Sequence, residues 1–280
     1  PMKKHLSTVL LIIILLAGSA IMLYPSFSDY WNSFHQSQAI ASYSESVSGL
    51  TEEDYEKLWL AACAYNAGLA EKSIPYKLTE AEWEEYLSLL DISGSGIMGY
   101  IEIPKIDCSL PIYHGTEESV LQVAVGHIES SSLPVGGAST HCVLSGHRGL
   151  PSAKLFTDLD RLSEGDIFQI RVLNETLTYE IDQIHIVLPH EVDDLGITRG
   201  QDHCTLVTCT PYGINSHRLL VRGRRIANPE QAVSVRVTSD AVRIDPVLVA
   251  PVAAAPMLLA LAVWLIINPG GKKTKKKRKT

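Results

Sequence analysis

The 280-residue chain contains only five cysteines, and none of them forms a closely spaced pair. An odd number of scattered cysteines excludes a disulfide framework as the basis of the fold. At least one thiol must therefore stay free, and in an exported protein a free thiol needs a chemical reason to persist. Cys63, Cys108 and Cys142 have apolar neighbours, which favours a role as small core residues. Cys209 is the cysteine with a reason to remain free, given below.

Metal-ligand spacing is missing as well. The candidate catalytic histidines include no pair on one face of a helix, the arrangement that many metal sites use. The sequence therefore predicts no metal site and no cofactor. These histidines are His114, His127, His141, His147 and His217.

Basic residues are scarce in the middle of the chain. The formal net charge is -7, and nine of the 24 Lys and Arg residues lie within the first four and the last nine positions. The centre is therefore acidic, which argues against a nucleic-acid partner.

Charged residues are absent from two long stretches, Leu6–Tyr24 and Pro246–Pro269. A helix needs about 20 apolar residues to cross a bilayer. We therefore predict an N-terminal membrane span or signal anchor within residues 1–25 and a second span over 246–269. A cleaved signal peptide ending in the small residues of Ala17–Ala20 is the alternative for the first stretch.

Lysines flank both predicted spans on their outer sides. Lys3 and Lys4 precede the first span, and a basic tail over 270–280 follows the second. Basic flanks stay preferentially in the cytoplasm. The sequence thus predicts a two-span protein of the cell membrane, with cytoplasmic termini and an extracellular central domain.

Two regions of different pattern lie between the spans. Residues 26–96 are polar with helical periodicity, and Thr51–Asp54 is typical of a helix start. We expect two or so helices there, packed on the domain that follows, because so short a bundle would bury little alone. Residues 97–226 contain eight candidate strands separated by turn residues, which indicates a closed or nearly closed barrel. Residues 227–245 form a polar linker.

The eight candidate strands were assigned from short apolar runs, and one helix is expected among them over Ala153–Leu162. The strands are Tyr100–Ile103, Leu110–Tyr113, Cys142–Leu144, Ile167–Val172, Leu177–Ile181, Ile184–Leu188, Thr205–Cys209 and Leu219–Gly223.

A hairpin at the end of this domain carries the candidate chemistry. Its first strand ends at Cys209, and its second strand begins near Arg218 after a Pro-Tyr-Gly-Ile-Asn turn. A cysteine can act as a nucleophile, and a guanidinium on the neighbouring strand can stabilise the oxyanion that its attack produces. The thiol also needs a proton partner, and His147 opens a Gly- and Pro-rich loop upstream. Cys209, His147 and Arg218 form the candidate triad.

These motifs resemble those of a known family. Thr205–Cys209 resembles the TLxTC signature of sortases, the cysteine transpeptidases of Gram-positive cell surfaces. The longer string through Arg218, with Met98–Ile106 and Leu110–Thr116, resembles the pilin-polymerising class C group. The likeness extends over residues 97–226.

The resemblance implies a mainly β fold, an eight-stranded sortase-type β-barrel with N-terminal helices and two flanking transmembrane helices. It also implies cleavage of an LPxTG-like sorting signal through a thioacyl intermediate on Cys209 and transfer to a pilin lysine. His147 and Arg218 fall on the family's histidine and arginine positions. Thr208 beside the cysteine could add a hydrogen bond to substrate or serve packing.

Class C sortases carry a lid with an Asp-Pro-aromatic motif over the active site. Residues 72–76 include Pro75 and Tyr76 at the matching positions, whereas Ile74 replaces the acidic residue. We expect a lid with Tyr76 over the thiol; an ordinary inter-helix loop is the alternative.

Three other functions remain open at this stage: a sortase that attaches surface proteins to the cell wall, a cysteine protease of another fold, and a non-enzymatic membrane-tethered barrel. The expected partners are pilins or surface proteins with LPxTG-like signals, together with the membrane.

Overall fold

The computed structural model of the chain describes residues 2–69 and 77–229, with side chains from Val9 onward. The residues from Asp29 onward in this described part belong to one compact unit, whereas those up to Ser28 belong to another. The predicted lid segment 72–76, the second predicted span and the basic tail lie outside the described residues, as does most of the predicted linker.

The chain starts with a single long helix, α1 (Met2–Ser48), which contains Pro25 and continues past the predicted end of the membrane segment. Its part Val9–Ser48 includes a window with a mean hydropathy of 2.3, none of which is buried. Among the described residues, this is the one helix long and apolar enough to cross a membrane, by length and composition.

Two shorter helices follow, and a capping threonine precedes each; the sequence indicates the first of these, Thr51. Before α2 (Glu52–Leu69), the Thr51 hydroxyl accepts a hydrogen bond from the amide of Asp54 at 3.2 Å. Before α3 (Glu80–Ser88), Thr79 and Glu82 form a full capping box. Such caps satisfy amides that the first helical turn leaves without partners.

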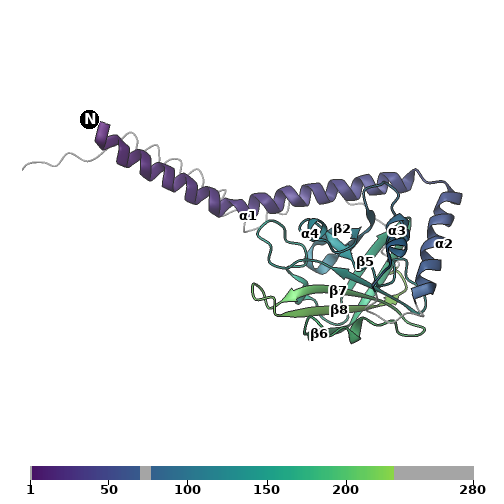
Figure 1. Ribbon diagram of the computed structural model, residues 1–280. Coiled ribbons are helices and arrows are strands. Elements are labelled where there is room, and N and C mark those ends of the chain that lie inside the picture. The colour runs from purple at the N-terminus through teal and green to yellow at the C-terminus, as the bar shows by residue number, and fades with distance from the viewer. Residues whose placement is uncertain (1, 70–76, 230–280) are drawn as a thin grey trace, which may run out of the picture. The chain divides into compact units, whose positions relative to one another are not determined.

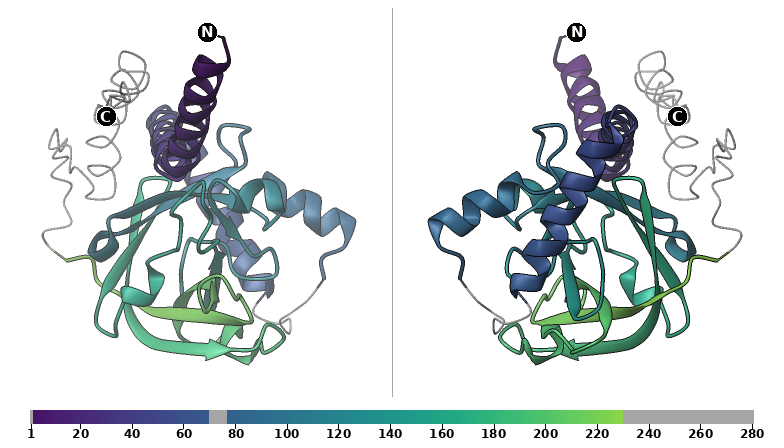
Figure 2. Two further views of the ribbon diagram at one scale, coloured as in Figure 1. Left: turned by 90° about the vertical axis from the view of Figure 1, so that its left-hand side faces the viewer. Right: turned by 90° about the vertical axis from the view of Figure 1, so that its right-hand side faces the viewer.

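The helices pack on the barrel, as predicted. Ala62 of α2 and Tyr86 of α3 are fully buried in the main core. Tyr43 of α1 donates its hydroxyl to the Met98 carbonyl at 3.0 Å and accepts from the Leu173 amide at 2.8 Å. Figure 2 shows α2 lying across the side of the barrel that the right-hand panel turns toward the viewer.

Eight strands form a closed barrel in the order β1-β2-β3-β4-β7-β8-β6-β5 (Figure 1). The pairs β2–β3 and β4–β7 are parallel, and the other pairs are antiparallel. The strands are β1 (Ile97–Ile103), β2 (Cys108–His114), β3 (Val125–His127), β4 (Thr140–Ser145), β5 (Ile167–Val172), β6 (Glu175–Val187), β7 (Asp202–Thr210) and β8 (His217–Ile226). The short helices are η1 (Pro104–Ile106), α4 (Glu118–Leu121), η2 (Leu159–Arg161) and η3 (Asp193–Leu195).

The predicted number of strands is right, but two assignments differ. The two strands predicted over Leu177–Ile181 and Ile184–Leu188 are one continuous strand, β6, with a register shift between Ile181 and Gln183. The shift interrupts the polar–apolar alternation, which made the sequence look like two strands. The three-residue strand β3 was not predicted.

The helix predicted over Ala153–Leu162 is wrong. The described segment contains only the 3-10 turn η2, and Leu155 has a positive φ of 39° that breaks any helix. Its apolar residues have near-helical spacing because Leu155, Phe156 and Leu159 are all buried in the main core of the barrel. Burial of every large residue in an irregular segment produces the same sequence pattern as an amphipathic helix.

Candidate active site

The hairpin β7–β8 places Cys209 and Arg218 directly opposite each other. They are partners in the antiparallel register, in which Thr208 pairs with Leu219 and Thr210 with His217. Side chains of directly opposed residues point to the same face of a sheet. The thiol and the guanidinium therefore share one face of the barrel wall.

The parallel pair β4–β7 brings His147 to the same end of the barrel. Ser145 pairs with Val207, and the Gly146 amide continues the ladder by donating to the Val207 carbonyl at 3.0 Å. His147 and Cys209 each lie two residues beyond this last strand pair. Two residues distant in the sequence thus reach one level of the wall because their strands run parallel and in register.

Cys209 points outward from the barrel. Leu206 belongs to the main interior core, whereas Val207 belongs to a separate apolar cluster on the outer face. Because side chains alternate along a strand, Cys209 shares the outer face with Val207. This outer cluster consists of Val143, Val207 and Leu220, with Ile128, Val187 and Leu195 packed against it. We call this cluster the apolar floor; its three central residues, Val143, Val207 and Leu220, are buried beneath the outer face that carries the thiol.

His147 is partly accessible, with a side-chain exposure of 28%, and Nε2 lies 3.7 Å from the Glu118 carboxylate of α4. The pKa of that carboxyl is lowered, first by a hydrogen bond from Gln122 and further by the histidine. Glu118 was not predicted from the sequence, because nothing in a four-residue helix about 30 positions upstream marks it as a neighbour.

Arg218 differs from Arg222 and Arg224 of β8 in its partners. It donates to the carbonyls of Asn215 at 3.3 Å and His217 at 3.2 Å. In the described part of the chain, no carboxylate forms an ion pair with it. Arg222 is held by Asp182, with two contacts of 3.0 Å, and Arg224 by Glu180 at 2.8 Å.

Thr208 is buried and does not reach the outer face. Its side chain is 2% exposed, and its hydroxyl donates to the Gly146 carbonyl at 2.7 Å. This bond links the residue before Cys209 to the residue before His147.

The other candidate histidines are occupied by structural hydrogen bonds. His141 contacts the Gly196 carbonyl through Nδ1 at 2.9 Å and Thr205 through Nε2 at 2.7 Å, and burial lowers its pKa to about 4. His127 contacts Tyr86 and the Ser132 carbonyl, and His114 contacts two backbone carbonyls. His217 contacts the Ser216 hydroxyl.

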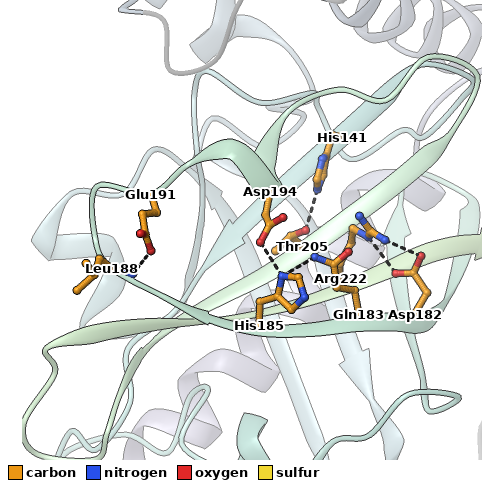
Figure 3. Close-up of polar contacts among 9 residues, drawn as sticks. All are labelled: His141, Asp182, Gln183, His185, Leu188, Glu191, Asp194, Thr205 and Arg222. Atoms are coloured by element: carbon orange, nitrogen blue, oxygen red, sulfur yellow. Dashed lines mark hydrogen bonds and ion pairs between the residues drawn. The ribbon is translucent and has the colours of Figure 1, made fainter.

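A polar network fixes the loop that follows β6 beside the apolar floor (Figure 3). The imidazole of His185 contacts Asp194 at 2.7 Å and the side-chain amide of Gln183 at 2.8 Å. The loop is held further by His141 at Gly196 and by the Glu191 carboxylate, which accepts from the Leu188 amide at 2.7 Å. These contacts were not predicted, because each joins residues whose proximity depends on the barrel.

Within the described residues, no group of three His, Cys, Asp or Glu side chains could hold a metal ion. All five cysteines are free, and Cys209 is partly exposed. The arrangement offers a thiol, an imidazole and a guanidinium at one end of the barrel, next to the apolar floor. Pro75 and Tyr76 of the predicted lid lie outside the described residues, so their position relative to the thiol stays a prediction.

Comparisons with known proteins point to one family. The sortase domain family matches residues 101–226. The crystal structure of sortase C1 from Streptococcus agalactiae is 52% identical, with a TM-score of 0.67 over 69% of this chain and 100% of that chain. The sortase C of Streptococcus pneumoniae is 42% identical, with a TM-score of 0.60 over 68% of this chain and 97% of that chain.

The curated relatives extend beyond the matched region. Sortase D of Bacillus subtilis is 31% identical over 131 residues, which are 46% of this chain and 63% of that protein. The match to sortase A of Streptococcus agalactiae covers 47% of that protein. The chain belongs to the sortase family of cysteine transpeptidases. Its solved structural neighbours include sortases of class C, at 40–52% identity.

Proposed function

We propose that the chain is a membrane-anchored class C sortase that cleaves an LPxTG-like sorting signal and joins it to the side-chain amine of a pilin lysine. The observation that carries the proposal is the register of β4, β7 and β8. It supports a meeting of His147, Cys209 and Arg218 at one end of the barrel. The solved relative from Streptococcus pneumoniae is described in terms of pilin substrate specificity.

The first half-reaction forms a thioester. The Cys209 thiolate attacks the carbonyl carbon of the threonine in the sorting signal and gives a tetrahedral oxyanion. Arg218, opposite the thiol, donates hydrogen bonds to that oxyanion, and its charge persists at every physiological pH. The imidazolium of His147 gives its proton to the departing amine. The C–N bond breaks, and the acyl group stays on sulfur.

The second half-reaction transfers the acyl group. The lysine amine of the acceptor attacks the thioester, and the now neutral His147 takes the proton that the amine loses. The C–S bond breaks, the thiolate returns, and the product is an isopeptide. Water competes with the amine at this step, so exclusion of water from the site favours transfer over hydrolysis.

The apolar floor supports the surface on which the sorting signal would bind. Val143, Val207 and Leu220 are buried, so an extended peptide would contact the partly exposed residues packed on them, Ile128, Val187 and Leu195. The loop fixed by His185 and His141 borders this floor through Leu195. A wall already held in place costs less ordering entropy when the peptide binds.

We also propose that α1 anchors the enzyme in the cell membrane and that its catalytic unit is extracellular. The length and mean hydropathy of 2.3 in α1 support this anchor. The basic residues at both ends of the sequence support cytoplasmic termini and a second span over 246–269. That second span lies outside the described residues.

The proposal is tested with the full-length chain in detergent, a peptide containing an LPxTG motif, and two acceptors. One acceptor offers a lysine side-chain amine from a pilin-derived peptide, and the other an N-terminal α-amine of the kind that cell-wall cross-bridges offer. Mass spectrometry separates the products. We expect an isopeptide with the lysine acceptor and none with a C209A variant.

The alternatives give different products in this assay. Preference for the α-amine would indicate attachment of surface proteins to the cell wall. A free carboxylic acid as the sole product, with both amines ignored, would indicate a cysteine protease. Either result would overturn pilin polymerisation.

A further inference from the structure

Arg148, the residue after His147, has a nearly buried guanidinium behind the candidate active site. Its side chain is 9% exposed, and it forms an ion pair with Asp160 in η2 through Nη2. Through Nη1 it donates to the Thr210 hydroxyl at 3.2 Å. Thr210 is the residue directly after Cys209. One guanidinium therefore connects the histidine loop, the cysteine strand and η2.

This contact and the one made by Thr208 form a matched pair. The Thr208 hydroxyl binds the Gly146 carbonyl at 2.7 Å, and the Thr210 hydroxyl accepts from Arg148. The residues on both sides of Cys209 are thus bonded to the residues on both sides of His147. Because strand residues alternate, Thr208 and Thr210 share the face opposite to Cys209. Both bonds lie behind the reacting groups.

The stability of the fold does not account for a buried arginine here. Moving a guanidinium out of water has a desolvation cost. The attraction to one carboxylate often does no more than balance that cost, so the pair adds little net stability. Nε of Arg148 is buried and finds no hydrogen-bond partner within the described part of the chain. A buried guanidinium that keeps one donor without a partner and still bridges two segments of the site points to a role in geometry.

We propose that Arg148 is a positioning residue, held by Asp160, that fixes the spacing of Cys209 and His147 by bridging Thr210 to the histidine loop. The inference rests on the proposed function of the site and deepens it. Gly146, directly before His147, is bonded to β7 through Val207 and Thr208. After His147 the loop has two other bonds: the His147 carbonyl accepts from the Phe156 amide at 3.1 Å, and the Gly149 amide donates to Thr157 at 3.1 Å. Neither bond reaches β7.

The variants R148Q, R148K, D160N, T210V and T210S test the bridge. Arg148→Gln removes the charge, and Arg148→Lys keeps it on a compact ammonium that lacks the planar fork of the guanidinium. Thr210→Val removes the hydroxyl at nearly constant volume, and Thr210→Ser retains it. The control is Arg161→Gln. Arg161 lies in η2, as Asp160 does, but its side chain is 70% exposed and pairs with Asp158 instead.

We expect loss of the bridge to lower turnover, because displacement of a reacting group by about 1 Å can reduce a rate by about 100-fold. R148Q and T210V should lower kcat by about 10- to 100-fold with little change in KM, and R148K and D160N should lie between them and the unsubstituted enzyme. T210S should restore most of the rate that T210V loses. The double variant R148Q/T210V should be no slower than R148Q, since both changes break one bond.

A second readout needs no substrate. The thiolate is the form of cysteine that alkylating agents attack, and a nearby imidazolium stabilises it. Iodoacetamide labelling of Cys209, located by peptide mapping, should slow in R148Q and T210V and stay unchanged in R161Q. Thermal unfolding shows which variants are folded; if R148Q is not, the pair T210V and T210S decides.

The outcomes separate the two proposals. Unsubstituted protein that forms no isopeptide would overturn the proposed function, while the labelling rates would still decide the role of Arg148. Isopeptide formation and labelling at unsubstituted rates in folded T210V and R148Q would overturn the positioning role alone. A loss of kcat that T210S does not restore would also contradict it.

Discussion

Cys209 and Arg218 are directly paired across β7 and β8. Cys209 lies near the end of β7, and Arg218 lies near the start of β8. Arg218 donates hydrogen bonds to two backbone carbonyls and, within the described residues, forms no ion pair. Its charge is therefore available to a group that arrives at the thiol.

This relationship predicts a specific loss on substitution. R218Q should reduce kcat for isopeptide formation by about 100-fold or more, as removal of one oxyanion donor does elsewhere. R218K should restore little of it, because an ammonium cannot reproduce the planar fork. The control is R224Q. Arg224 is an exposed arginine of β8, the strand that also carries Arg218, and it is paired with Glu180 of β6. Equal rates for R218Q and R224Q would contradict the assignment.

The bond from Thr208 to Gly146 predicts a loss of stability. Thr208→Val leaves the buried Gly146 carbonyl without its side-chain donor, which should lower the free energy of unfolding by about 1–3 kcal/mol. Thr208→Ser keeps the hydroxyl and should lose less. Urea denaturation of both variants, followed by circular dichroism, measures the difference. A T208V variant as stable as the unsubstituted chain would argue against this bond.

His141 predicts a dependence of stability on pH. Burial lowers its pKa to about 4, below the ordinary value of 6.5. The unfolded chain thus takes up a proton that the folded chain refuses, so stability should fall as the pH falls from about 6.5 toward about 4.

The effect of His141 is separated from that of other groups by comparison with H141Q. Between pH 7 and pH 5 the unsubstituted chain should lose about 2 kcal/mol more than H141Q, since one pKa unit corresponds to 1.36 kcal/mol. Burial also lowers the pKa of His114 and His203, but both proteins contain these residues. Urea unfolding at the two pH values gives the numbers. Parallel losses in both proteins would contradict a neutral His141.

The contact between His185 and Asp194 predicts an effect on substrate binding. Asp194→Asn removes the ion pair that holds the loop beside the apolar floor. Exposed ion pairs contribute little free energy, so KM should rise only several-fold. The value of kcat should stay nearly unchanged. The neighbouring Asp193 makes no ion pair with any described residue, so D193N serves as the matched control. A fall in kcat with constant KM would indicate that the loop acts on the chemistry instead.

The sequence predicted the β7–β8 hairpin and the barrel class well, because strand alternation and turn residues are local signals. The prediction for β5 matches Ile167–Val172 at both ends. It failed where local patterns are ambiguous. The bulge in β6 looked like a turn, three residues were too few to mark β3, and the buried Leu155 and Phe156 imitated a helix.

The candidate site shows the same division between local and long-range information. Cys209, His147 and Arg218 were singled out by residue type, loop context and family motif. The contacts of Glu118 with His147, and of Arg148 with Thr210, join residues that lie about 30 and 60 positions apart. Such contacts depend on the closure of the barrel, which no single stretch of sequence encodes.

The most direct test of the mechanism is to locate the acyl group. The full-length enzyme is mixed with a sorting-signal peptide in the absence of an amine, quenched in acid and digested for mass spectrometry. We predict an acyl adduct, cut after threonine, on the peptide that contains Cys209, and its disappearance when a lysine acceptor is added before the quench. An adduct on any other residue, or isopeptide formation by C209A, would contradict the account.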